Sequence, residues 1–237
     1  MSLGNAFSYL TILPIPYKRQ VPLLRSVHFF PLVGAGMGSL LALFFVGSTQ
    51  IVPAWLIAPA IIGLLEWMTG GAHLRAVGEL AMGRRTFPGH GFGKPTPYSR
   101  RGLAAIITML AIKAAALLII VPGFQPYAVL LLPICGRCAQ TLGIVFSRHR
   151  QDNQTPDAAM ARRRIRAVFL TVLLGFLLFL LPLRIGAFLA LEYGIGLTLW
   201  YRVMNSRNQG LTVQTLGAAA AFSETLFLVS LALLSRI

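Results

Sequence analysis

The sequence predicts an all-α integral membrane protein, a polytopic helical bundle of about seven transmembrane helices. Its 237 residues are 56% hydrophobic and only 11% charged, with a mean hydropathy of +0.73. Soluble domains carry about a quarter charged residues, so this composition excludes an ordinary soluble fold. Several mostly apolar runs reach the length of about 20 residues that a helix needs to cross a bilayer. We therefore expect residues 1–237 to form a single membrane domain.

Residues 2–12 predict a short amphipathic helix at the membrane interface. Pro14 and Pro16 end it, because proline cannot continue a helix. After a basic link, the chain alternates between apolar runs and connections that contain glycine, proline or charge, such as residues 122–126. The expected spans cover residues 29–47, 53–70, 103–121, 127–146, 167–182, 186–202 and 215–235.

Two long basic segments, 71–102 and 147–166, predict the orientation of the protein. Together with the N-terminal link and the loop after the sixth span, they hold 17 of the 21 Lys and Arg residues. The opposite loops and the C-terminus hold only Arg184 and Arg236. Because cationic loops stay on the cytoplasmic side, we expect a cytoplasmic N-terminus. The protein would then be a multi-pass protein of a bacterial or archaeal cytoplasmic (inner) membrane, with 71–102 and 147–166 as cytoplasmic loops.

The formal net charge of +15 also limits the partners. Nucleic-acid-binding proteins gather their cations on one soluble face, whereas these lie between hydrophobic spans. We therefore expect no nucleic acid. Anionic lipid and a phosphorylated small molecule are the expected partners.

Five charged residues fall within the apolar spans. Such charges are costly in a membrane, so they pair with one another or face an internal cavity. Pairing of Lys113 or Arg137 with Glu192 or Glu224 would be purely structural, whereas contact with a substrate would be functional. The sequence leaves both open. The five residues are Glu66, Lys113, Arg137, Glu192 and Glu224.

One stretch, residues 68–85, carries the strongest local pattern. An apolar run ends at a Gly-Gly pair, His73 follows, and the next residues predict a helix. Positions 75, 79 and 82 are spaced i, i+4 and i+7, so their side chains share one helix face. A membrane enzyme that handles phosphates with magnesium would place carboxylates there. In this chain the face carries Arg75, Glu79 and Met82.

Five short runs, in order along nearly the whole chain, resemble motifs of one family. They are Phe7–Pro16, Phe30–Gly34, Met68–Leu74, Arg148–Arg150, and Thr215–Ala218 with Glu224. On these runs the chain resembles the cobalamin synthase family, the adenosylcobinamide-GDP ribazoletransferases. In that family the third run leads into an acidic motif, Asp-Gly-Leu-Ala-Asp-x-x-Asp-Gly. The fifth belongs to a closing motif with one aspartate and two glutamates.

The resemblance implies transfer of phospho-adenosylcobinamide from its GDP ester to α-ribazole or its phosphate, with release of GMP. Mg²⁺ assists in the family, where it would neutralise the diphosphate. The chain resembles a divergent member with a degenerate acidic motif. The three motif aspartates fall on Arg75, Glu79 and Met82. In the closing motif the aspartate falls on Gln214, the first glutamate on Ala221 and the second on Glu224.

The resemblance also implies a site. Glu79 and His73 would be catalytic, and Glu79 and Glu224 would bind Mg²⁺. Four arginines would contact the phosphates of the substrate, because guanidinium binds phosphate oxygens in pairs. The ligand would be a corrinoid nucleotide or another phosphorylated small molecule, and other cobalamin-synthesis proteins are possible partners. The four arginines are Arg75, Arg100, Arg101 and Arg137.

Two functions are consistent with this pattern. In the first, the chain is a divergent enzyme that uses Glu79 and Glu224 with help from its arginines. In the second, it is a non-catalytic membrane homologue that binds a corrinoid, nucleotide or lipid phosphate, or scaffolds cobalamin-synthesis enzymes. A transporter or channel would rest only on the number of spans and the charges within them.

Overall fold

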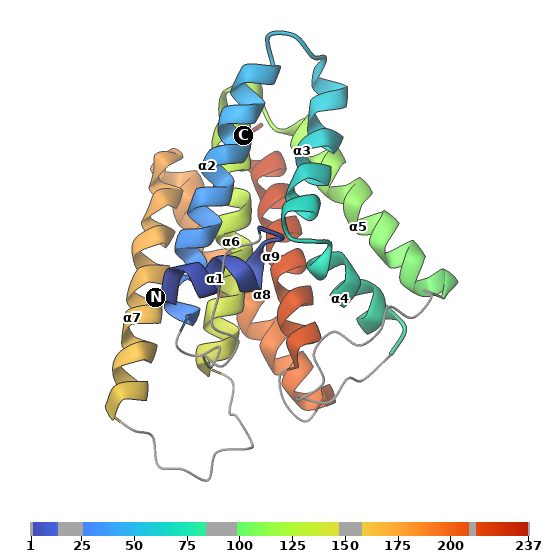
Figure 1. Ribbon diagram of the computed structural model, residues 1–237. Helices are drawn as coiled ribbons and strands as arrows, with labels where there is room; N and C mark the ends of the chain where they lie inside the picture. Colours follow the sequence, from blue (N-terminus) through green and yellow to red (C-terminus); the bar gives the residue numbers. More distant parts are fainter. Residues whose placement is uncertain (1, 14–25, 84–98, 147–157, 209–211, 237) are drawn as a thin grey trace.

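The computed structural model describes residues 2–13, 26–83, 99–146, 158–208 and 212–236, which form helices without a strand (Figure 1). The Gly- and Pro-rich segment 84–97 and the basic run 148–150 lie outside these residues. The elements are α1 (Ser2–Leu10), η2 (Val27–Phe29), α2 (Phe30–Ser48), α3 (Ala54–Met68), α4 (Ala72–Ala81), α5 (Arg100–Ile119), η3 (Pro122–Phe124), α6 (Gln125–Phe146), α7 (Ala158–Gly175), η4 (Phe176–Leu180), α8 (Leu183–Asn208) and α9 (Val213–Leu234).

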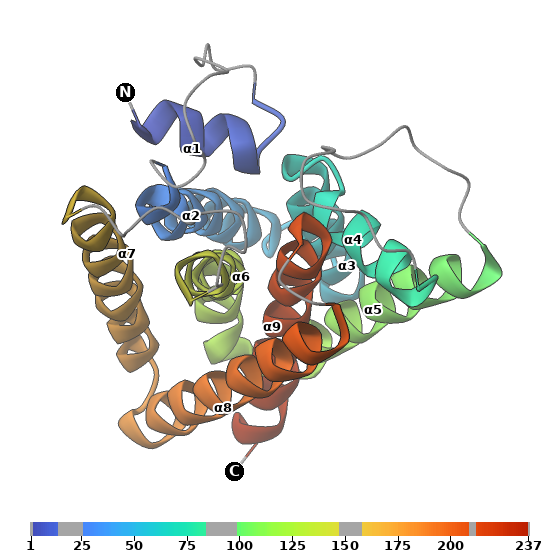
Figure 2. The ribbon, with the colours of Figure 1, turned by 90° about the horizontal axis from the view of Figure 1, so that it is seen from below.

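Helix α6 is the centre of the bundle. Viewed along its axis it is surrounded by α2, α7, α8 and α9 (Figure 2). In the span that contains it, 83% of the apolar stretch is buried, against 22% in α5 and 17% in α8. The large hydrophobic side chains that α5 and α8 expose are mostly leucine and isoleucine, as expected of helices that face lipid. The charged residues Lys113, Arg137 and Glu224 within the spans are enclosed by neighbouring helices.

The helices confirm the predicted membrane bundle. Within the described residues, five helical segments are long and apolar enough to cross a membrane, and the bent pair of α3 and α4 adds a sixth only when the two helices are counted as one span. The expected fifth span corresponds to a shorter apolar helix, Ile165–Leu178, so a total of seven crossings stays a prediction. The other spans match closely, because long apolar runs carry the strongest helix signal.

The ends of the helices that adjoin the basic segments lie together. The start of α5, the end of α6 and the starts of α7 and α9 are all at one end of the bundle, opposite the α2–α3 turn (Figure 1). This arrangement agrees with the predicted sidedness, although the orientation itself stays a prediction. Segment 71–102 carries a helix at each of its ends, since α4 fills residues 72–81 and α5 begins at Arg100.

A sharp bend separates α3 from α4. The two helices meet at 91° across a short break. Gly70 and Gly71 take φ values of +64° and +66°, which side chains disfavour, and this explains the Gly-Gly pair in the sequence. The predicted N-terminal helix, α1, ends against this bend, because the Ile12 N–H donates to the Met68 carbonyl oxygen at 3.0 Å. The bend turns α4 back toward α9 and so creates the site.

Candidate functional site

Helix α4 presents the predicted face to its neighbours. Arg75, Glu79 and Met82 are all half-buried, and Met82 caps the C-terminal end of the helix. The elements that pack against α4 are the N-terminal part of α9 and the start of α5. The helix itself is confirmed, and the i, i+4, i+7 spacing does place the three residues on one partly covered face.

Glu79 meets α9. The Gln214 side-chain amide donates a hydrogen bond to Glu79 Oε2. These two residues are 135 positions apart in the chain, and each occupies a position where the resembling family carries an aspartate. The fold therefore brings the acidic motif and the closing motif together, although only one of the two positions is an acid here. The bond fixes the orientation of the Glu79 carboxylate.

Met82 meets the start of α5. The Ser99 N–H donates to Met82 Sδ at 3.2 Å, and the Ser99 hydroxyl accepts from the Gly102 N–H as the N-cap of α5. Arg100 and Arg101 follow in the first turn and are exposed. Cations there oppose the helix dipole, which favours negative charge at an N-terminus. Two arginines together with the helix N-terminus make this corner attractive to a phosphate.

His73 contacts Arg137. The guanidinium Nη1 donates to His73 Nε2, and also to Gln140 Oε1 at 3.1 Å. Arginine has no acceptor atom, so His73 Nε2 must be unprotonated and the ring neutral, with its proton on Nδ1. Both side chains are buried, with exposures of 3% and 0%. In this arrangement the Nε2 lone pair is occupied, and His73 would act as a base only after Arg137 moves away.

Arg137 also reaches the N-terminal helices. Its Nη2 donates to the Leu10 carbonyl oxygen at 3.4 Å and approaches Met37 Sδ at 3.7 Å. The Leu10 contact could not be predicted from the sequence, because a backbone carbonyl can accept from any donor. Arg137 therefore lies inside the protein, between α1, α2, α4 and α6, and not on a phosphate-binding surface.

Lys113 forms a buried ion-pair cluster. Its Nζ donates to Glu224 Oε2 at 2.7 Å and to Glu66 Oε1 at 3.1 Å. Of the pairings that the sequence left open, the structure shows that of Lys113 with Glu224, and Glu66 is an additional partner. Among the described residues, neither Arg137 nor Glu192 forms an ion pair. Glu192 instead accepts a hydrogen bond from the Ser230 hydroxyl.

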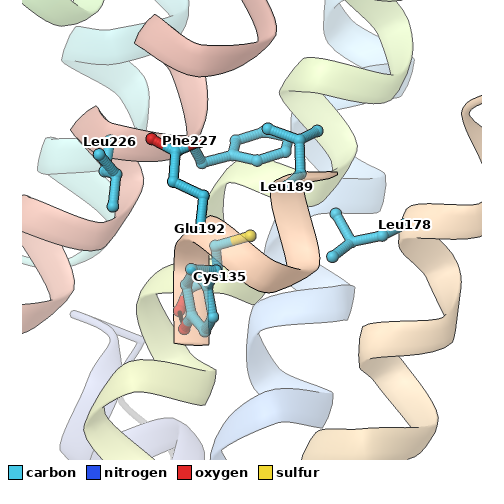
Figure 3. A pocket seen from close by; sticks show the side chains of 7 residues that line it. Cys135, Leu178, Leu189, Glu192, Leu226 and Phe227 are labelled. Atoms are coloured by element: carbon cyan, nitrogen blue, oxygen red, sulfur yellow. Dashed lines mark hydrogen bonds between the residues drawn. The ribbon is translucent and has the colours of Figure 1, made fainter. Parts of the chain in front are cut away.

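Glu192 belongs to another part of the bundle. It lines a small, mostly apolar pocket between α6, α8 and α9, beside Cys135 and Phe227 (Figure 3). Cys135 and Cys138 are both free and buried. Glu192 is the one acid among the described residues that line this pocket, and no cation lines it, so we assign this pocket no part in the site.

The predicted metal pair, Glu79 and Glu224, is separated by the fold. Glu79 binds Gln214, and Glu224 lies ten residues further along α9. Ten residues of α-helix span about 15 Å, whereas two ligands of one Mg²⁺ ion lie roughly 4 Å apart. Glu224 is also neutralised by Lys113. A single ion held by both carboxylates does not fit this geometry.

The described residues do not fit a protein-built magnesium site. No group of three or more His, Cys, Asp or Glu side chains in this part of the chain is arranged to hold a metal. Glu79 is the one carboxylate at the contact of α4 with α9, and its helical neighbour Arg75 is a cation. What the described residues do offer is one carboxylate held by Gln214, with Arg75 on the same helix face and Arg100 and Arg101 at the start of the neighbouring α5.

The sequence matches one protein family along most of its length. The family model described as Cobalamin-5-phosphate synthase matches residues 2–81 and 100–232. An adenosylcobinamide-GDP ribazoletransferase of Stutzerimonas stutzeri is 32% identical, with 96% of each chain covered. One of Acinetobacter baumannii is 27% identical over 94% of this chain and 93% of its own. One of Alkaliphilus metalliredigens is 24% identical over 93% and 91%. No solved structure matches the chain.

Proposed function

Because the chain belongs to the cobalamin-5-phosphate synthase family, we propose that it acts as an adenosylcobinamide-GDP ribazoletransferase of the cytoplasmic membrane. The observation that carries the proposal is the similarity to enzymes of that name over more than nine-tenths of both chains. The reaction, as the family resemblance implies it, joins phospho-adenosylcobinamide to α-ribazole or its phosphate and releases GMP. The substrate is therefore a corrinoid nucleotide.

The contact between α4 and α9 is the proposed reaction site. Phosphoryl transfer depends mainly on positioning and on neutralising the charge of the phosphates. Glu79, held by Gln214, would accept the proton of the attacking ribazole hydroxyl. The ribazole oxygen would form a bond to the cobinamide-bound phosphorus as the P–O bond to GMP breaks. Arg75 on the same helix and Arg100 at the start of α5 would contact the diphosphate of the donor and the phosphate of the departing GMP. The site lies at the end of the bundle that we propose to face the cytoplasm.

The same arginines would replace part of the charge that a metal supplies in other phosphoryl transferases. Guanidinium groups bind phosphate oxygens in a bidentate manner and need no carboxylate ligands. The chemistry proposed for this chain therefore includes no step at a protein-bound Mg²⁺ ion. Exposed cations such as Arg100, Arg101 and Arg166 would also meet anionic lipid at the membrane surface.

A substitution of Glu79 tests the site. Glu79→Gln keeps the size and the contact with Gln214 but removes the base, so GMP release from adenosylcobinamide-GDP and α-ribazole should fall about 100-fold or more. Glu192→Gln is the matched control, because Glu192 is also a carboxylate within a helix of the bundle but lies away from α4. The activity of the Glu192→Gln variant should equal that of the wild type. Equal activity of Glu79→Gln and wild type would refute the proposed base. Unchanged nucleotide binding without GMP release in the wild type would indicate a binding protein.

A further inference from the structure

Within the described residues, three buried charges form one cluster between three helices. Glu66 comes from α3, Lys113 from α5 and Glu224 from α9. Their side chains are 7%, 0% and 0% exposed. The ammonium nitrogen bridges the two carboxylates at 3.1 and 2.7 Å. No part of the proposed reaction uses this cluster, so its purpose needs a separate explanation.

The two carboxylates offer more oxygen atoms than the lysine uses. Glu66 Oε2 and Glu224 Oε1 are buried and have no hydrogen-bond partner. The carboxylate of Glu224 lies against Gly136 of α6, where a Cβ atom would come within 3.0 Å of Glu224 Cγ and Cδ. Buried carboxylate oxygens that converge from different helices are the ligand type that hard cations prefer. The cluster thus has the composition of a cation site whose occupant is an ammonium group.

The charges of the cluster are balanced only with the lysine in place. Two ionised carboxylates carry two negative charges, which Lys113 offsets by one, and the nearby Arg137 interacts electrostatically with both acids. Removal of one member of a buried ion pair leaves an uncompensated charge, and this is strongly unfavourable. Two carboxylates that share a buried site must then take up a proton or another cation.

We propose that Glu66 and Glu224 form a buried cation site in which Lys113 is the resident cation. In the wild-type protein the ammonium group excludes divalent ions from these carboxylates, so Glu224 binds no Mg²⁺. Without the lysine side chain, the vacated space would admit a divalent ion with several waters, since such an ion needs only one or two carboxylates. The inference is independent of the proposed activity, because it concerns bound metal and not turnover.

Mn²⁺ binding to the purified full-length protein tests the site. Mn²⁺ prefers the same oxygen ligands as Mg²⁺, and its bound fraction can be counted by electron paramagnetic resonance. Lys113→Ala should bind one more Mn²⁺ per chain than the wild type. Its melting temperature in detergent should be lower than wild type and should rise by several degrees as Mn²⁺ is added. The double variant Lys113→Ala/Glu224→Gln should lose the additional ion.

Two results would overturn the proposal. The first is a folded Lys113→Ala variant that binds no additional Mn²⁺. The second is a wild-type protein whose Mn²⁺ content falls in Glu66→Gln or Glu224→Gln, because the lysine would then not exclude the metal. This second comparison does not need Lys113→Ala to fold. Glu192→Gln serves as control in both, since its carboxylate accepts from Ser230 and lies outside the cluster.

Discussion

Arg137 is held by groups from four helices, and none of them is an acid. Within the described residues its partners are a histidine, an amide, a backbone carbonyl and a thioether. A guanidinium can bind several neutral acceptors at once because its five N–H groups point in fixed directions. This explains how a membrane helix accommodates a fully buried arginine, and it makes Arg137 a link between α1, α2, α4 and α6.

Arg137→Lys should therefore destabilise the protein although the charge is kept. A lysine ammonium cannot reach His73 and Gln140 together with the Leu10 carbonyl, and the loss of charged hydrogen bonds costs about 1–3 kcal/mol. The melting temperature in detergent should fall by several degrees. Arg184→Lys is the matched control, because Arg184 is exposed; its melting temperature should match wild type. An unchanged melting temperature for Arg137→Lys would show that the guanidinium contacts carry no stability.

The sequence predicted which buried polar residues need a partner, but it did not predict which residue that partner is. The sequence indicated that Lys113 and Glu224 need compensation, and they pair. The resemblance implied Glu79 and Glu224 as Mg²⁺ ligands, whereas Glu79 contacts Gln214 and Glu224 pairs with Lys113 ten residues further along α9. Helical spacing relates residues on one helix, and it gives no distance between helices. For the same reason, the contact of His73 with Arg137 could not be deduced from either segment.

At the scale of the elements, the bend between α3 and α4 determines where the proposed reaction site lies. Gly70 and Gly71 both take positive φ values. The turn that they form sets α4 at 91° to α3. The sequence showed the Gly-Gly pair and a helix after it, so the existence of both was predictable. The direction of α4 was not, because it depends on packing against α9 and on the contact with α1.

Gly71→Ala should weaken both stability and activity. Alanine at a φ of +66° is strained, and the expected cost is about 1–2 kcal/mol. A shift of α4 would also misplace Glu79, so GMP release should decrease together with the melting temperature. Gly63→Ala is the control within α3, because open space surrounds it and its backbone is helical; there alanine should be neutral or slightly stabilising. Identical behaviour of the two variants would contradict the role of the turn.

For the whole molecule, the apolar runs predicted the bundle and most of its spans. They could not give the arrangement, in which α6 is central and α5 and α8 face outward. Lipid and protein interior are equally apolar, so hydropathy does not distinguish a central helix from a peripheral one. The family assignment needed the motifs, and the comparisons confirm it over nearly the whole chain. The remaining question is whether a site with so few acids still catalyses the reaction.

Turnover by the wild-type protein in lipid nanodiscs answers that question most directly. With adenosylcobinamide-GDP as donor, GMP should appear only when α-ribazole is present, together with an equal amount of the corrinoid product that carries the ribazole. Binding of the donor alone is measured in parallel. A protein that binds adenosylcobinamide-GDP but releases no GMP at saturating α-ribazole, with or without added Mg²⁺, would contradict the proposed activity and identify the chain as a non-catalytic homologue.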